Sequence, residues 1–116
     1  MNIQIQTSDL DATDAIRDFV LEKFGHLTKV VNDPDALCTV TLKRVTNHQK
    51  QGEVYKVLVH LRTVKSVFQI EEISEDLYAG VDMAKDSTER AVITNSKKQR
   101  TLWRRAAAQF KKLLRK

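Results

Sequence analysis

The sequence has little of what marks secreted or membrane proteins. Its single cysteine, Cys38, excludes an internal disulfide, which fits a reducing compartment. No run of 18 apolar residues occurs, so no segment is predicted to span a membrane. The N-terminus lacks a basic region followed by an apolar stretch. No signal peptide is therefore predicted, and the cytoplasm is the expected location.

Signatures of catalysis are also missing from the sequence. His26, His48 and His60 share no metal-ligand spacing with Cys38 or with one another. There is no glycine-rich phosphate loop, no Ser-His-acid arrangement and no His-Glu-x-x-His motif. Cys38 alternates with apolar residues and is predicted to be a buried thiol. We therefore expect no enzyme, no cofactor, no metal site and no small-molecule substrate.

Acidic residues are absent from the last part of the chain. The 116 residues have a net charge of +5, but residues 97–116 hold nine Lys/Arg and no acid, and residues 1–96 carry a net −4. A block of one sign is typical of an arm that binds a polyanion, most often a nucleic acid. The alternative is a solvated helix that only adds solubility. Length, apolar content (41%) and charged content (30%) fit one soluble globular domain.

Hydrophobic periodicity predicts four strands and two helices. Strands are expected over residues 2–6, 37–45, 54–62 and 64–70, with a polar turn over 46–53. Thr13 is expected to cap the first helix. The residues predicted to face the core are Ile3, Ile5, Ile16, Phe19, Val20, Phe24, Leu27, Cys38, Val40, Leu42, Tyr55, Val57, Val59, Leu61, Phe68 and Ile70.

A single helical phase fits all of residues 76–116, and Ser74 offers an N-cap for this second helix. At 100° per residue, every basic residue from Arg90 onward lies within about 80° of Arg90. The opposite face carries Leu77, Val81, Ala84, Thr88, Val92, Leu102, Trp103, Ala106, Phe110, Leu113 and Leu114. Asn95 and Gln99 interrupt this apolar stripe, so we expect the helix to leave the core near them.

The order β-α-β-β-β-α predicts an α+β fold with a four-stranded mixed sheet. The helical crossover makes the first two strands parallel, and the short later connections make strands two to four antiparallel. Both helices should cover one sheet face. A helix of 41 residues would be about 60 Å long, whereas the sheet is roughly 15–20 Å wide. The second helix should therefore end in a basic extension beyond the sheet.

Three stretches resemble the ribosome hibernation-promoting factors, also called ribosome-associated inhibitors or subunit-interface proteins. The first is residues 1–5 (Met-Asn-Ile-Gln-Ile), together with Thr13, the block 16–20 and Lys23-Phe24. The second is Leu42-Lys43, within a strand that ends near Val45-Thr46. The third is residues 76–82 (Asp-Leu-Tyr-Ala-Gly-Val-Asp), with Arg90 at a basic position further along. The resemblance is to the short form of the family and covers residues 1 to about 98.

The resemblance implies a β-α-β-β-β-α fold and a translation inhibitor of resting cells. Family members bind the small ribosomal subunit in the channel for messenger and transfer RNA, and contact its rRNA through basic helix residues. The chain is accordingly divided into a hibernation-factor-like domain, residues 1–98, and a basic amphipathic extension, residues 99–116. The predicted RNA-binding residues are Lys23, Arg90, Lys97, Lys98, Arg100, Arg104, Arg105, Lys111 and Lys112. Ser87 and Thr94 depart from the pattern, because close relatives carry lysines there, and Thr88 replaces an apolar residue.

Several alternatives stay open on the sequence alone. Lys23 lies within an apolar arc, so it either binds RNA or only packs its stem with the amine at the rim. Trp103 and Phe110 either pack or stack on bases. The apolar face of the extension is expected to fold back, to pair with a second copy or to dock on a ribosomal protein. The runner-up functions are a general double-stranded-RNA-binding module and an adaptor that docks on a membrane or a partner through the tail.

Overall fold

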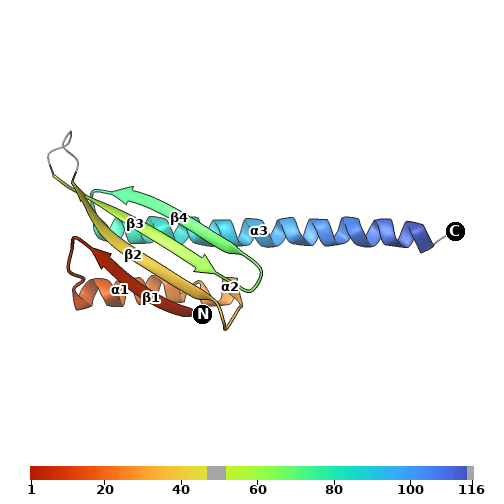
Figure 1. Cartoon of the computed structure of the whole chain (residues 1–116), viewed down its shortest axis with the longest axis horizontal. Helices are drawn as coiled ribbons and strands as arrows, with labels where there is room; N and C mark the ends of the chain where they lie inside the picture. Colours follow the sequence, from red (N-terminus) through yellow and green to blue (C-terminus); the bar gives the residue numbers. More distant parts are fainter. Residues whose placement is uncertain (47–51, 115–116) are drawn as a thin grey trace.

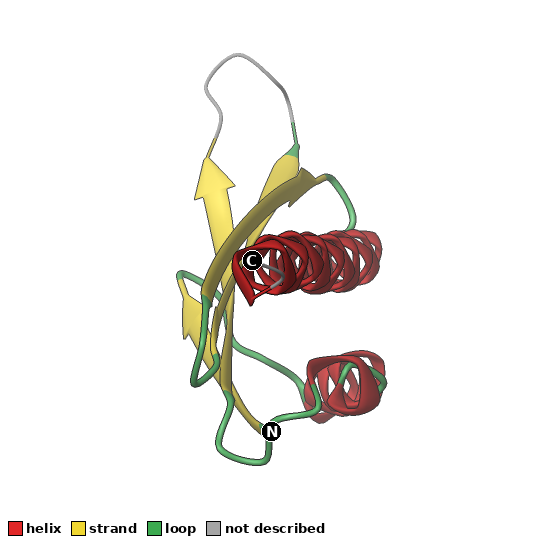
Figure 2. Ribbon diagram, turned by 90° about the vertical axis from the view of Figure 1, so that its right-hand side faces the viewer, coloured by secondary structure: helices red, strands yellow, loops and turns green. Residues whose placement is uncertain are grey.

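The chain folds into one sheet with its helices on a single face, as Figures 1 and 2 show. The structure is a computed structural model that describes residues 1–46 and 52–114. Its elements are β1 (Asn2–Ser8), α1 (Asp14–Gly25), α2 (Thr28–Val31), β2 (Leu37–Thr46), β3 (Glu53–Arg62), β4 (Val67–Ser74) and α3 (Leu77–Leu114). Most of the predicted turn 46–53, including His48, lies outside the described residues, as do residues 115–116.

The sheet has the strand order β1-β2-β3-β4. β1 runs parallel to β2, whereas β2–β3 and β3–β4 are antiparallel, so the expected mixed sheet is confirmed. Alternate residues on the helix side form the core, because side chains in a strand point to opposite faces. The fully or nearly fully buried members of this face are Cys38, Val40, Leu42, Val57, Val59 and Leu61.

Helix α1 begins as its sequence predicts. The hydroxyl oxygen of Thr13 accepts a hydrogen bond from the Ile16 N–H at 3.2 Å, which satisfies one of the free donors of the first turn. The helix ends at Gly25, before Leu27, which is fully buried in the link to α2. The short helix α2 was not predicted. It ends at Val31 and is capped by Asn32, whose φ of 48° is the left-handed conformation that asparagine tolerates.

The prediction for the last strand was wrong in its start. Residues 64–66 belong to a turn in which the Thr63 N–H donates to the Ser66 carbonyl at 2.8 Å. The Thr63 hydroxyl oxygen also accepts from the Ser66 N–H at 2.9 Å. This local side-chain bonding competes with strand pairing. Phe68 and Ile70 nevertheless pack against the core, as expected.

The predicted cap of the long helix was also wrong. Ser74 is the last residue of β4, and its hydroxyl oxygen accepts from the Asp76 N–H at 3.2 Å. Asp76 is the capping residue instead, because its carboxylate accepts from the Tyr78 N–H at 3.1 Å. A carboxylate at this position also complements the positive end of the helix dipole.

Gly80 brings the first turns of α3 close to the sheet. A Cβ at this position would lie 3.2 Å from Cγ2 of Val57 and 3.4 Å from Cβ of Ser74, which is tighter than most side-chain contacts. The glycine therefore sets the approach of α3 to β3 and β4.

Further along α3, Thr88 is fully buried, and its hydroxyl donates a hydrogen bond to the Ala84 carbonyl at 2.7 Å.

Helix α3 is continuous and extends well beyond the sheet (Figure 1). Its last buried residue is Val92, and Gln99 is the last that is partly buried. Asn95 donates to the Ser66 hydroxyl oxygen at 3.1 Å at the sheet's end. Residues 100–114 are all exposed, and we call them the overhang. The molecule is 70 Å long, with a radius of gyration of 18.5 Å, whereas a compact chain of this length has about 13 Å.

Candidate nucleic-acid interface

The predicted basic residues of α3 form one continuous exposed surface. Because α3 is a single helix to Leu114, its 100° spacing keeps them on one side. No acidic residue interrupts the chain from Arg90 to Leu114. We call this surface the basic ridge, and its members, all exposed, are Arg90, Lys97, Lys98, Arg100, Arg104, Arg105, Lys111 and Lys112.

Within residues 1–46 and 52–114, no ridge residue is in an ion pair. Arg90 donates a hydrogen bond to the Ser87 hydroxyl oxygen at 3.3 Å, and this hydroxyl donates to a Glu72 carboxylate oxygen at 2.7 Å. The acidic residues of the body therefore leave the charge of the ridge uncompensated. Such a charged surface attracts polyanions and concentrates them at the helix.

The charge along α3 changes sign between Glu89 and Arg90. The preceding turns carry Asp82, Asp86 and Glu89. Lys85 lies between them, 3.5 Å from the Asp86 carboxylate and 2.9 Å from that of Glu89. The hydrogen bond that the Lys85 amine donates to Glu89 is the main cause of a raised pKa of Lys85. Lys85 is therefore held within the body, and the cationic surface begins only after it.

Lys23 lies apart from the ridge, at the seam between α1 and α3. Its amine is 3.4 Å from the Asp82 carboxylate and 5.5 Å from the centre of the Phe19 ring. The Phe19 ring meets the Tyr78 ring edge-on, with centroids 5.0 Å apart. Asp82 precedes Arg90 by about 12 Å of helix rise. The structure thus gives Lys23 a partly buried side chain whose amine has a carboxylate partner.

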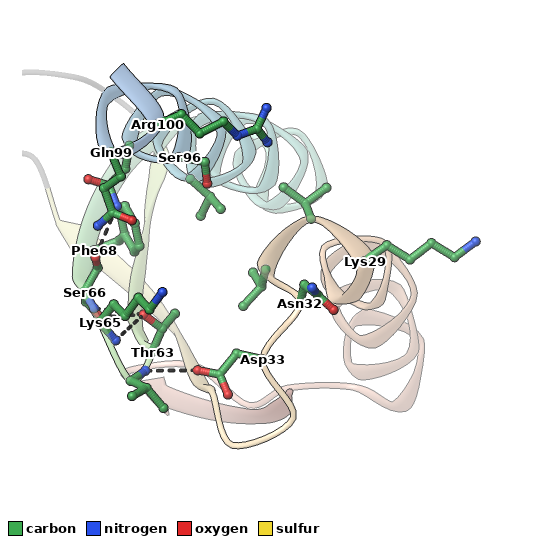
Figure 3. Close-up of a pocket in the computed structure, with 15 residues that line it drawn as sticks. Lys29, Asn32, Asp33, Thr63, Lys65, Ser66, Phe68, Ser96, Gln99 and Arg100 are labelled. Atoms are coloured by element: carbon green, nitrogen blue, oxygen red, sulfur yellow. Dashed lines mark hydrogen bonds between the residues drawn. The ribbon is translucent and has the colours of Figure 1, made fainter. Parts of the chain in front are cut away.

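A cavity of about 500 Å³ lies where α3 leaves the sheet, between α2, the β3–β4 turn and α3 (Figure 3). The Asp33 carboxylate crosses from the α2–β2 loop to the turn, where it accepts from the Val64 N–H at 3.0 Å. It also accepts from the Asp35 N–H at 2.9 Å. These two donors, Val64 first, lower the pKa of Asp33. Arg100 of the ridge also lines this cavity.

Sequence reasoning missed this cavity. Its lining comes from three segments that are far apart in the chain. No spacing within any one segment reports the contact between Asp33 and Val64, which are 31 residues apart. The signal in the sequence was the pair of acids around Pro34, which is typical of a turn that binds its own backbone.

Within the described residues, the side chains of Cys38, His26 and His60 are not grouped as a metal site requires. Burial raises the pKa of the Cys38 thiol to about 11, so the thiolate is scarce at neutral pH. His26 and His60 are exposed and belong to different elements. The described part of the chain holds no group of three His, Cys, Asp or Glu residues arranged for a metal ion. Its helices also include none with the length and apolar character needed to cross a membrane.

Comparison with known proteins supports the resemblance seen in the sequence. Residues 3–100 match the model of the family described as Sigma 54 modulation protein / S30EA ribosomal protein. The chain belongs to this S30EA family. The match includes the sheet apart from Asn2, together with α1, α2 and α3 up to the start of the overhang.

One curated relative of this S30EA chain is the ribosome hibernation promotion factor of Staphylococcus aureus (strain COL). It is 36% identical over 93 residues, which are 79% of this chain and 46% of that protein. The chain thus spans about half the length of this relative.

Two solved structures have a similar fold. The N-terminal domain of Thermus thermophilus Protein Y has a TM-score of 0.67 and 29% identity, with 79% of this chain and 96% of that chain covered. A ribosomal subunit interface protein from Coxiella burnetii has a TM-score of 0.66 and 17% identity, with 83% and 98% covered, and shows the likeness of fold alone.

Two of the three positions at which the resemblance implied a departure from the family pattern make side-chain hydrogen bonds. Ser87, where a lysine was expected, ties α3 to β4 through its bond to Glu72. Thr88, where an apolar residue was expected, is buried with its hydroxyl bonded to Ala84. Thr94, the third, is exposed next to the ridge.

Proposed function

We propose that this chain is a non-catalytic inhibitor of translation that binds the small ribosomal subunit through its rRNA. It occupies the channel of messenger and transfer RNA and excludes both by its bulk. The observation that carries this proposal is the basic ridge, which is exposed and makes no ion pair within the described residues, on a fold of the S30EA family. The name of its relative from Staphylococcus aureus, a ribosome hibernation promotion factor, supports the same partner.

The two parts of the chain have different roles in this proposal. Residues 1–98 form the body that fits the subunit and contribute Lys23, Arg90, Lys97 and Lys98. Residues 99–116 extend the contact along the rRNA. The overhang is about 22 Å long, which is enough to follow several phosphates of an A-form strand.

Affinity would come mainly from neutralised phosphates. Each Lys or Arg that contacts a phosphate releases condensed counterions, so binding weakens steeply as salt rises. Arginine adds forked hydrogen bonds to phosphate, and Arg100, Arg104 and Arg105 supply these along the overhang. Folded RNA is recognised largely by shape, phosphate and 2′-hydroxyl groups, which a stiff helix can contact without aromatic side chains.

A general double-stranded-RNA-binding module is the less favoured reading. That class shares the α-β-β-β-α order but lacks a strand before the first helix. β1 is fully integrated in this sheet, with Ile3 and Ile5 paired in register with Cys38 and Val40. The strand that double-stranded-RNA-binding modules lack, β1, is therefore present in this fold.

Co-sedimentation with small subunits tests the proposal. We expect binding at about 50 mM salt that weakens at least tenfold by about 200 mM. The double variant Arg104→Glu/Arg105→Glu should bind about tenfold more weakly and show a flatter salt dependence. The control is Arg62→Glu, which makes the same kind of charge change at an exposed position on β3. This control should bind small subunits like the unmodified chain, and it is compared with the single variant Arg105→Glu. Failure to co-sediment at low salt would exclude the ribosome as partner. Tighter binding to a plain RNA duplex than to small subunits would favour a general double-stranded-RNA-binding module.

A further inference from the structure

The face of the overhang opposite the basic ridge is apolar and uncovered. Its large side chains Leu102, Trp103, Phe110, Leu113 and Leu114 have exposed fractions of 60%, 77%, 62%, 71% and 70%. With Ala106 they form a stripe that we call the apolar seam. The seam continues the helix face that packs on the sheet, so it points into the space beyond the sheet's end. Soluble monomers seldom expose a contiguous patch of this kind.

The seam is symmetric about Ala108. Its six residues form three pairs at equal distances on either side of that position: Leu102 and Leu114 at six residues, Trp103 and Leu113 at five, Ala106 and Phe110 at two. When two copies of the helix run antiparallel with their Ala108 residues at the same level, the members of each pair also lie level with each other. Ala108 itself is on the ridge side of each helix, opposite the seam. The sequence is therefore complementary to its own reversed copy, as a two-fold symmetric interface requires.

The spacing of the seam also suits a helix pair. Trp103, Ala106, Phe110 and Leu113 are separated by three, four and three residues, the alternation of a coiled-coil seam. In the antiparallel register the large Phe110 ring faces the small Ala106 of the other copy. In the layers on either side of these central pairs, Trp103 of one copy faces Leu113 of the other. Large residues thus meet small or flexible ones, which favours close packing.

The charges of the overhang lie away from this seam. The positions that flank its centre are Ala107 and Gln109, which are uncharged. Arg104, Arg105 and Lys111 lie on the far side of each helix. With axes about 9 Å apart, the two ridges would be roughly 20 Å from each other. This separation exceeds the Debye length of about 8 Å at physiological salt, so their repulsion is largely screened.

We propose that two copies of this chain associate through their overhangs as an antiparallel helix pair centred on Ala108. All residues from 102 to 114 then face residues within the same range, so neither body enters the overlap. The five large side chains offer on the order of 600 Å² per copy, or about 1,200 Å² in the pair. That area is at the lower limit for a stable interface, so the association is concentration-dependent. The proposal does not depend on the ribosomal function, because the basic ridge stays exposed in the pair.

Sedimentation equilibrium of the full chain tests whether the pair forms. We expect the average mass to rise from one chain toward two as concentration increases to about 1 mM. Leu113→Glu should keep the chain monomeric, because it places a charge in the seam. The matched control is Ala108→Glu, the same new charge on the opposite side of the helix, which should still dimerise. A wild-type chain that stays monomeric, or equal loss of dimer in both variants, would overturn the proposal.

Disulfide trapping tests the register and direction. Trp103→Cys and Leu113→Cys should form a linked dimer when the two variants are mixed under oxidised glutathione, and each variant alone should form little. Cys38 should not form a disulfide in this experiment, because it is buried and its pKa is about 11. A linked dimer from Trp103→Cys alone would show parallel helices and contradict the register. Arg104→Glu/Arg105→Glu should dimerise normally, so loss of ribosome binding and loss of the pair are separable.

Discussion

Lys23 and Asp82 join the two main helices through an ion pair of 3.4 Å. The lysine amine also lies over the Phe19 ring, 5.5 Å from its centre. The side chains are 32% and 51% exposed, and pairs as accessible as this one contribute at most about 1 kcal/mol. A phosphate can therefore displace Asp82 at little cost. Lys23 thus pairs with Asp82 and lies over Phe19, and its contact with RNA stays a prediction.

This relationship predicts opposite effects for changes at its two ends. Lys23→Met keeps the apolar stem on Phe19 but removes the charge, so affinity for small subunits should fall about two- to fivefold. Asp82→Asn removes the competing carboxylate, and affinity should rise by a similar factor. Both free energies of unfolding should stay within about 1 kcal/mol of the original. Co-sedimentation and urea unfolding measure the two quantities. If Lys23→Met changes only the unfolding free energy, Lys23 does not contact RNA.

Thr88 is a buried polar residue in a position that packs against the core. Its hydroxyl donates to the Ala84 carbonyl at 2.7 Å, a bond typical of threonine inside a helix. Thr88→Val has the same shape and leaves no new unsatisfied side-chain donor. We expect it to stabilise the fold by up to about 1 kcal/mol, whereas Thr88→Ala should destabilise it by about 1–2 kcal/mol through the cavity left behind. Urea unfolding of the two variants checks this order, and a destabilised Thr88→Val would show that the hydroxyl is needed.

The regular parts of this fold could be predicted from hydrophobic patterning. Alternation fixes the buried face of each strand, because a one-residue slip would move Cys38, Val40 and Leu42 to the outer face. The single helical phase after Asp76 also predicted that α3 would outrun the sheet. The same helical phase places the basic residues of the ridge on one side of α3. That side could therefore be predicted from the sequence alone.

The errors come from bonds between local side chains and backbone. The Thr63 hydroxyl turns residues 63–66 away from the strand, and Asp76 rather than Ser74 takes the free donors of α3. Both outcomes depend on which of two nearby polar residues reaches a backbone group, and periodicity says nothing about that. The contact of Asp33 with Val64 was beyond prediction for another reason. It depends on how two loops meet after the sheet has formed.

Asp33 gives the fold a dependence on acid pH. Its pKa is lowered from 3.8, first by the Val64 N–H and then by the Asp35 N–H. The ionised form is therefore favoured by folding, and its contribution is present above the unfolded pKa and is lost as pH falls through the folded value. Asp33→Asn should lower the melting temperature at pH 6, and the gap from the original chain should close below about pH 3.8. Melting curves from pH 3 to 7 measure the gap.

The matched control for this change is Asp35→Asn, which removes the same charge two residues away. The hydrogen bond to Asp33 uses the Asp35 backbone N–H and survives the change of side chain. We therefore expect a smaller gap with weaker pH dependence. Equal profiles for the two variants would mean that net charge, and not the bond across to Val64, sets the acid response.

The overhang should be separable from the body. Residues 100–114 are exposed along their whole length, so they add no buried surface to the core of a single chain. A chain ending at Gln99 should keep its sheet and melt within about 4 °C of the original at a concentration where both are monomeric, because only surface interactions are lost. Its far-ultraviolet circular dichroism should lose helical signal in proportion to the residues removed.

The same truncation measures how much of the overhang contacts RNA. It removes the described ridge residues Arg100, Arg104, Arg105, Lys111 and Lys112. If all five neutralise phosphates, the slope of log affinity for small subunits against log salt should flatten by about 3.5 to 4.5. An unchanged slope would place the ribosomal contact on the body alone, with Lys23, Arg90, Lys97 and Lys98. A truncated chain that no longer folds would show instead that the overhang supports the core.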